Sequence, residues 1–389
     1  MDDQGRPGGV AVAERTFRTV TVEQTRRRVE PMLPRFGITR VADVTRLDEI
    51  GLPVHVAYRP CGKTLAVSLG IGLSPAQSWV SAVMESIETW HSENETLDVV
   101  ARGSARAVKP GYDVRELNLA ERSPLTEHTV LDWVAATGLL TGRPMLVPRE
   151  LIRLDSTTRL TWNHLLFQVS SNGLGTGNTA TEATLHGLIE LIERDCCSPY
   201  TVTPLSRRRY VDPATTDNLT TRTALAALRA ADCWVEVCET TNDMGIPAYA
   251  CSIWSPDVPL IFGGFGCHPD AGLAVGRAVM EAIQSRLAAV SGARDDIDGA
   301  HYDLADATVA PTTAGRILHP ISADAGPDGG AEPLLRFCAE RVRARTGVEP
   351  MVVDLTKPEI GIAASKVVAP GLALCGEREM SKRPGEDHV

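Results

Sequence analysis

The stretch that decides the fold is SNGLGTGNTATEATLHGLIELIERD, residues 171–195. A glycine-rich segment leads into a segment with helical periodicity, for which we expect a helix over roughly residues 178–200. Because a helix turns about 100° per residue, Glu182, His186, Glu190 and Glu193 share one strip about 80° wide. An otherwise amphipathic helix therefore carries acidic side chains where apolar ones are expected.

Two further segments, 73–95 and 271–292, also predict helices with polar residues at helical spacing. The residues that share a face are Ser81, Glu85 and Glu88 in the first helix and Arg277, Glu281, Gln284 and Ser285 in the second. We find no short-period repeat in the chain. All three predicted helices nevertheless carry glutamates at corresponding positions along the helix.

A solvated face with salt bridges between successive turns is the simplest interpretation of such a helix. It fits poorly here, because Glu85, Glu88 and Glu182 have no lysine or arginine three or four residues away. Their neighbours are apolar on several sides, as in a buried helix. Buried carboxylates repel one another, and a bound divalent cation is the simplest remedy. Carboxylate oxygens with substrate phosphates are the ligands that Mg²⁺ prefers, so the pattern indicates a magnesium–nucleotide site.

The glycine-rich loop adds a weaker indication of the same kind. Gly173, Gly175 and Gly177 allow close backbone approach, and a helix that begins near Asn178 offers free N–H groups to an anion. The loop matches neither the Walker pattern nor the dinucleotide-binding pattern.

The bulk properties exclude several classes of protein. The 389 residues include 43% hydrophobic and 23% charged residues, the profile of a soluble globular protein. The formal net charge of −10 argues against nucleic acid or an anionic membrane as the main partner. The nine cysteines form no C-x-x-C pair, which favours a reduced, cytoplasmic protein over a zinc site or a disulfide scaffold. No secretory signal and no membrane-spanning run is expected.

The order of elements favours an α+β fold. Hairpin signals cover 130–152, and helices come singly between strands, which argues against a doubly wound parallel sheet. Strands are expected at 54–60, 63–70, 234–240, 246–254, 349–355 and 365–372, and a further helix at 332–346. We expect an N-terminal segment 1–54 for substrate or partner contact, a catalytic domain 55–375 and a flexible tail 376–389.

Three motifs, in this order and spacing, resemble those of the YcaO family of ATP-dependent enzymes that modify peptide backbones. They are SAVMESIETWHSE (81–93), with S-x-x-x-E-x-x-E; GNTATEATLHGLIELIERD (177–195), with N-x-x-x-E and E-x-x-E-R-D; and AVGRAVMEAIQSRLAAVSGARDD (274–296), with E-x-x-Q-x-R. The resemblance covers roughly residues 55–375. It implies a YcaO-like fold, with helices packed on mainly antiparallel sheets around a central ATP cavity.

The resemblance also implies roles for individual residues. Mg²⁺ on the phosphates would be held by Glu85, Glu88, Glu182, Glu190 and Glu193. ATP would be contacted by Ser81, Asn178, Arg194, Glu281, Gln284 and Arg286, and the groups at the reacting atoms would be Glu193, Arg194 and Arg286. Arg286 lies off the Glu281 face by helical spacing. His91 and His186 are candidates for proton transfer.

The implied reaction is activation of a peptide backbone amide by phosphorylation of its oxygen. MESIETWH and KVVAPGL (366–372) resemble members that work with a TfuA-type partner, so thioamide formation is slightly favoured. Azoline or amidine formation, a non-catalytic docking subunit, and a ligase or kinase acting on a small molecule remain alternatives. The partners implied are a ribosomally made precursor peptide and a TfuA-like or leader-binding protein, and a homodimer is possible.

The chain departs from the family pattern at three places. GIG stands at 70–72 where many relatives have G-K-G, so a basic phosphate contact is absent or supplied by Lys63. Thr89 stands where many relatives have arginine. GEREMSKRPGEDHV (376–389) lacks the P-x-P-x-P ending of azoline-forming members.

Overall fold

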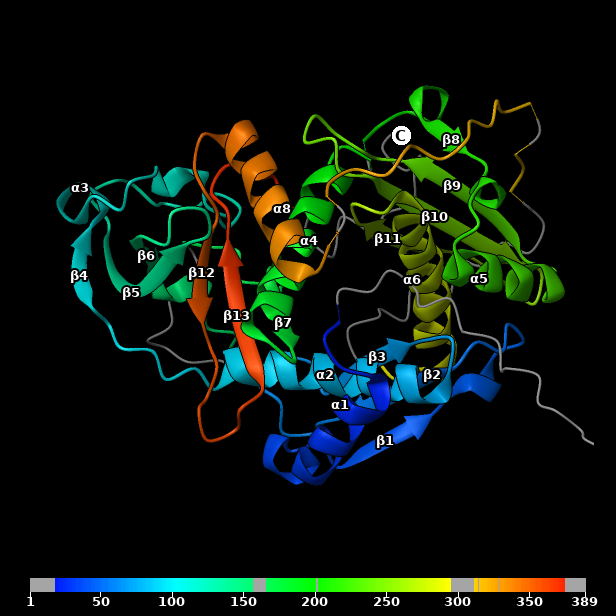
Figure 1. Ribbon diagram of the computed structural model, residues 1–389, viewed down its shortest axis with the longest axis horizontal. Coiled ribbons are helices and arrows are strands. Elements are labelled where there is room, and N and C mark those ends of the chain that lie inside the picture. Colours follow the sequence, from blue (N-terminus) through cyan, green and yellow to red (C-terminus); the bar gives the residue numbers. More distant parts are fainter. Residues whose placement is uncertain are drawn as a thin grey trace, which may run out of the picture.

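Three strand–helix units form the centre of the molecule (Figure 1). In each unit a strand leads directly into a long helix: β3 (Val67–Ile71) into α2 (Pro75–Glu93), β7 (Leu174–Gly177) into α4 (Ala180–Cys197), and β11 (Val258–Cys267) into α6 (Ala271–Ser291). The structure is a computed structural model that describes residues 18–156, 166–200, 202–294, 311–313, 315–327 and 329–374.

One glycine in each strand lets the following helix approach closely. A Cβ atom added there would meet a backbone oxygen eight residues later, at 2.4 Å from Ser78 after Gly70, 2.0 Å from Ala183 after Gly175 and 2.2 Å from Ala274 after Gly266. No side chain larger than hydrogen fits these contacts. The residues contacted on the helices are also small, so strand and helix pack backbone against backbone.

The same spacing continues along the helices. Glu85, Glu190 and Glu281 lie 15 positions after their glycines, and Glu88, Glu193 and Gln284 lie 18 positions after them. The units therefore repeat in sequence as well as in structure. The repeat is hidden from a search for short periods, because the glycines are 105 and 91 residues apart.

The three units contact one another in a closed cycle. Helix α2 contacts β7 of the second unit, α4 contacts β11 of the third unit, and α6 contacts β3 of the first. Each helix thus lies between its own strand and the strand of the next unit. Three equivalent interfaces result, and the residues at positions 15 and 18 of each repeat, glutamates except for Gln284, are carried by the helices that form them.

All strand pairs between named strands are antiparallel in the part of the chain that the structure describes. One sheet has the order β1 (Arg40–Asp43), β2 (Val54–Tyr58), β3; a second has β11, β10 (Ala248–Ser255), β9 (Trp234–Glu239), β8 (Arg209–Val211). The third has β4 (Ala101–Ser104), β5 (Val130–Gly138), β12 (Met351–Asp354), β13 (Ala363–Val368), β7, with β6 (Pro144–Pro148) paired to β5. The α+β class with mainly antiparallel sheets is confirmed.

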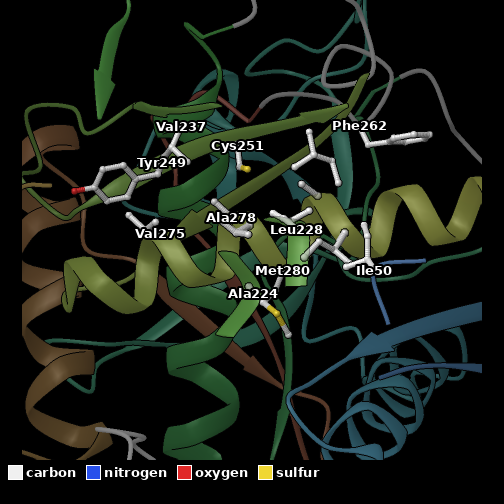
Figure 2. Packing of buried hydrophobic residues seen from close by; sticks show 14 of the residues in the cluster. Ile50, Ala224, Leu228, Val237, Tyr249, Cys251, Phe262, Val275, Ala278 and Met280 are labelled. Carbon is white, nitrogen blue, oxygen red and sulfur yellow. The ribbon is translucent and has the colours of Figure 1, made fainter. Parts of the chain in front are cut away.

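In the described part of the chain, further helices pack on the central units or, in the case of α3, on β4. They are α1 (Val22–Val29), which packs on α2; the short α3 (Ala105–Val108); α5 (Leu219–Ala230), which packs on α6; and α8 (Ala331–Thr346), which packs on α4. Figure 2 shows Val275 and Ala278 of α6 below Tyr249 and Cys251 of the four-stranded sheet, with Leu228 of α5 beside them. Both long sides of α6 are therefore buried.

One expectation about local structure is wrong, and two elements were not predicted. Residues 174–177, expected as part of a glycine-rich loop, form β7 and pair with β13. Strand β11 and helix α5 were not expected. Glycines at 263, 264 and 266 weaken the strand pattern of β11, and in both glycine-rich strands tertiary contact with a helix outweighs the low strand propensity of glycine. The expected flexible tail 376–389 lies outside the described residues.

We predict that Gly175→Ala destabilises the protein by about 3 kcal/mol, because its Cβ must push β7 away from α4. Gly330→Ala is the matched control, since nothing lies within 4 Å of a Cβ at that position, and its cost should stay below about 0.5 kcal/mol. Urea unfolding curves measure both. Equal midpoints for the two variants would refute the close strand–helix contact.

Candidate functional site

Two carboxylates meet at the interface of the first and second units. Glu88 of α2 is partly buried, and its pKa is raised to about 8, first by burial and then by the charges of Glu190 and Glu85. Burial also raises the pKa of Glu190, although Arg194 and a 2.8 Å hydrogen bond from the backbone N–H of Gly173 oppose this. Glu88 and Glu190 therefore form a carboxylate pair that lacks full charge compensation.

A second pair meets at the interface of the second and third units. Burial, followed by the charge of Glu193, raises the pKa of Glu281 to about 7. The backbone N–H of Phe265 donates a 2.8 Å hydrogen bond to the Glu281 carboxylate, which fixes its position. Glu193 is 5% exposed and pairs with Arg194 at 3.0 Å.

The two carboxylate pairs occupy corresponding positions of the repeated strand–helix units. Each combines position 18 of one unit with position 15 of the next: Glu88 with Glu190, then Glu193 with Glu281. The corresponding positions of the third interface are Gln284 and Glu85. An amide therefore stands where the other interfaces have a second acid, and this signal was available in the sequence once the glycines were aligned.

Two buried cations accompany the carboxylates. Arg194 lies 3.0 Å from Glu193 and 3.6 Å from Glu190, and although burial disfavours its charge, these glutamates raise its pKa. Lys366 of β13 is 4% exposed, and burial lowers its pKa to about 8 against the attraction of Glu190 and Glu88. Sequence reasoning missed Lys366 as a site residue, although a lysine within the apolar run of β13 was a visible signal.

Glu182 is separate from these pairs. The backbone N–H groups of Thr19 and Asn178 donate to its carboxylate at 2.5 Å and 3.1 Å, and Arg18 lies 3.6 Å away. Burial acts to raise the pKa of Glu182, but these hydrogen bonds and the Arg18 charge hold it below its usual value. The Thr25 hydroxyl contacts the side-chain oxygen of Asn178 at 3.2 Å. The segment 18–25 thus closes over the start of α4, which the sequence did not indicate.

The two histidines have different surroundings. His186 is partly buried, and its pKa is lowered to about 3 by burial and by the charges of Arg277 and Arg18. His91 is fully buried beside Phe36, and its Nδ1 lies 2.9 Å from the carbonyl oxygen of Ile87. His91 is therefore a packed core residue, whereas His186 lies in the charged region around Glu182.

Other expected site residues lie apart from the two pairs or at their margin. Arg286 is 1% exposed and pairs with Asp48 at 2.9 Å and with Asp257 at 2.6 Å. Its guanidinium joins α6 to other elements, in line with its position off the Glu281 face. Ser81 and Glu85 are exposed, at the outer end of the site. The Lys63 ammonium donates to the carbonyl oxygen of Glu93, so it is engaged at the end of α2.

These residues fit Mg²⁺ and a nucleotide. Raised pKa values at Glu88 and Glu281 mean that the buried carboxylates lack positive charge, and a divalent cation supplies it. Among the described residues no three His, Cys, Asp or Glu side chains gather closely enough to form a metal site by themselves. Mg²⁺ commonly uses one or two carboxylates and completes its octahedron with phosphates and water, which suits separate pairs.

Sequence comparison gives a matching family model, described as YcaO cyclodehydratase, ATP- and Mg²⁺-binding, over residues 69–373. An uncharacterized protein of Mycobacterium tuberculosis is 34% identical over 384 residues, which are 96% of this chain and 86% of that protein. A protein described as uncharacterized, in the tfuA 3′ region of Rhizobium leguminosarum bv. trifolii, is 32% identical over 91% of this chain and 88% of its own length.

Solved structures share the fold. A heterocyclase in complex with substrate and cofactor gives a TM-score of 0.75 at 20% identity, over 94% of this chain and 54% of the heterocyclase chain. This chain thus spans about half of that larger protein. YcaO from Methanopyrus kandleri, bound with AMPPCP and Mg²⁺, gives a TM-score of 0.67 at 20% identity, over 96% of this chain and 98% of that chain. Within the described ranges, none of the helices combines the length and apolar character that crossing a membrane requires.

We predict that, without divalent cations, titration of Glu88 and Glu281 lowers the free energy of unfolding as the pH rises from 6.5 to 8. The folded protein holds protons on Glu88 and Glu281, with pKa values of about 8 and about 7, which the unfolded chain, with carboxyl values near 4.5, has already lost. Lys366 and His186 act in the opposite direction, because burial lowers their pKa values to about 8 and about 3, so the contribution of Glu88 is measured as the difference between its variant and the wild type.

Urea unfolding in EDTA at successive pH values measures this effect. Glu88→Gln should make the decline shallower, since one of the two groups no longer titrates. Glu340→Gln, at an exposed position of α8, is the control and should follow the wild type. An equally steep decline in Glu88→Gln and wild type would show that Glu88 is not a buried, proton-holding carboxyl.

Proposed function

The chain belongs to the YcaO family of ATP- and Mg²⁺-binding cyclodehydratases, and on this premise we propose that it activates a backbone amide of a ribosomally made peptide by phosphorylating the amide oxygen. The observation that carries the proposal is the two carboxylate pairs, Glu88–Glu190 and Glu193–Glu281. The raised pKa values of Glu88, Glu190 and Glu281 correspond to a site that is short of positive charge.

The carboxylate pairs would hold Mg²⁺, with Glu85 at the exposed end. ATP supplies the phosphoryl group that makes the amide oxygen a leaving group, and Mg²⁺ neutralises the phosphate charge. Arg194, already held by Glu193 and Glu190, would present a fixed positive charge to the phosphates. Asn178 lies two residues before α4, and Ser81 lies on the exposed face of α2, where they would contact the nucleotide.

Three other proposed ligands, Gln284, Glu182 and Arg286, differ in whether their present contacts leave them able to bind the nucleotide or Mg²⁺. Gln284 occupies the repeat position of Glu88 and Glu193, so it belongs with the nucleotide contacts. Glu182 would reach Mg²⁺ only if the segment around Thr19 and Arg18 moved away from it. Arg286 would have to leave Asp48 and Asp257, and we therefore assign it to the structure of α6 rather than to the reaction.

Thioamide formation with a TfuA-like partner is the reaction that we slightly favour. It is supported by the 32% identical relative described as lying in the tfuA 3′ region. Azoline formation is the second candidate, supported by the family description as cyclodehydratase. In both reactions the amide oxygen leaves as phosphate; a sulfide equivalent replaces it in the first, and a Cys, Ser or Thr side chain closes a ring in the second.

Mass spectrometry of a peptide substrate separates these reactions. Candidate precursor peptides are incubated with the protein, ATP and Mg²⁺, with and without a TfuA-like protein and a sulfide source. Replacement of one oxygen by sulfur supports thioamide formation, and loss of one water supports an azoline. Phosphorylation or ligation of a small molecule with every peptide unchanged would contradict the proposal.

We predict that Glu193→Gln weakens binding of Mg²⁺–ATP by about 100-fold or more, because it removes one carboxylate of the second pair and the partner of Arg194. Isothermal titration calorimetry with a non-hydrolysable ATP analogue measures the affinity. Glu340→Gln, on the exposed face of α8, is the charge-matched control. Wild-type affinity in Glu193→Gln would place the nucleotide elsewhere.

A further inference from the structure

Lys366 is a buried lysine in a strand whose other residues are small or apolar. All six residues of β13 are buried, and Lys366 itself is 4% exposed. Its ammonium group donates a 2.6 Å hydrogen bond to the carbonyl oxygen of Ser170. A lysine is almost never buried to this extent unless an opposite charge balances it.

The opposite charges are those of the first carboxylate pair. Glu190 and Glu88 are the charged groups whose attraction acts on Lys366, and Lys366 in turn acts on Glu190. The ladder pairs Lys366 with Leu174, beside Gly173, whose N–H binds Glu190. Lys366 thus comes from a strand outside the three repeated units to the interface of the first and second units.

Comparison of the repeated units explains why the Glu88–Glu190 pair needs a cation from a strand outside these units. In the second unit Arg194 follows Glu193 directly and supplies a positive charge to the second pair. The equivalent position after Glu88 is Thr89, whose hydroxyl donates to the carbonyl oxygen of Glu85 at 3.1 Å. Helix α2 therefore brings no arginine to the first pair from the position after Glu88, whereas Arg194 of α4 lies 3.6 Å from the Glu190 member.

We propose that Lys366 is the counter-ion of the Glu88–Glu190 pair, a positioning residue that holds both carboxylates in place until Mg²⁺ binds. It supplies to the first pair the charge that Arg194 supplies to the second. The inference rests on the proposed function, because it assigns Mg²⁺ to the same carboxylates. Like charges buried together repel strongly, so one cation at this interface preserves the arrangement that the metal requires.

The first test is a double-mutant cycle in metal-free buffer. Lys366→Met removes the charge and keeps most of the volume, and we expect the melting temperature to fall by about 5 °C. In the double variant Lys366→Met/Glu190→Gln the loss should be smaller, because one of the repelling charges is also gone. Simple addition of the two single effects would overturn the pairing.

A folding failure of Lys366→Met does not remove the test. The double variant Lys366→Met/Glu190→Gln has the same net charge at the first pair as the wild type, so it should fold and melt cooperatively. An unfolded double variant would show that Lys366 is needed for packing rather than for charge, and would overturn the proposal.

The second test uses the repeat directly. Thr89→Arg places an arginine at the position equivalent to Arg194, and in the Lys366→Met background it should restore at least half of the lost melting temperature. In the wild type, where Lys366 already supplies the charge, the same substitution should give no gain. A double variant no more stable than Lys366→Met contradicts the shared role.

The third test measures the response to Mg²⁺ alone. Mg²⁺ should raise the melting temperature of Lys366→Met more than that of the wild type, because the metal replaces the missing cation. Lys357→Met, which removes a lysine that contacts Thr96 at 3.2 Å, is the matched control and should respond as the wild type does. Equal responses in Lys366→Met and wild type would overturn the proposal.

The proposed function is judged by a separate measurement. Calorimetry of the wild type with Mg²⁺ and a non-hydrolysable ATP analogue reports nucleotide binding, whatever the behaviour of Lys366. Absence of that binding refutes the function, while the metal-free cycle still decides whether Lys366 pairs with Glu88 and Glu190.

Discussion

The structure depends on one constraint: carboxylates of like charge are buried where neighbouring strand–helix units meet. Gly70, Gly175 and Gly266 let each helix approach its own strand to backbone contact. The residues 15 and 18 positions later, which are acids except for Gln284, are then carried into the interface with the next unit. Burial and mutual repulsion raise the pKa of Glu88 to about 8 and that of Glu281 to about 7. Close packing stabilises the fold, but it also places carboxylates where they need nearby cations to balance their charge. These carboxylates make up the site.

The acidic residues of the three helices fall into two groups, which differ in the direction of their pKa shifts. Glu182 is satisfied by backbone N–H groups and by Arg18, so its pKa is lowered. Glu88 and Glu281 have fewer partners, and their pKa values are raised. The acidic residues of the three helices thus include a structural residue that anchors the N-terminal segment and others that remain short of positive charge.

The sequence predicted the parts of this site that follow from periodicity. The three helices, their acidic faces, the α+β class and the YcaO resemblance were all readable from residue spacing. Strands β7 and β11 were not, because their glycines favour loops and acquire strand geometry only by packing on α4 and α6. The contacts of Arg286 with Asp48 and of Lys366 with Ser170 join residues more than 190 positions apart, and no local pattern encodes such contacts.

The cyclic arrangement also explains why a repeated frame can build an asymmetric site. Two interfaces combine acid with acid, whereas the third has Gln284 at the position of Glu88 and Glu193. An amide has no charge and both donates and accepts hydrogen bonds, so it creates no demand for a cation. The cations beside the two acidic interfaces also have different origins. Arg194 belongs to the second repeated unit, whereas Lys366 comes from β13, outside the repeated units. Substitution at single positions of equivalent interfaces is therefore enough to make two of them acidic and one neutral, while the backbone frame that positions all three stays the same.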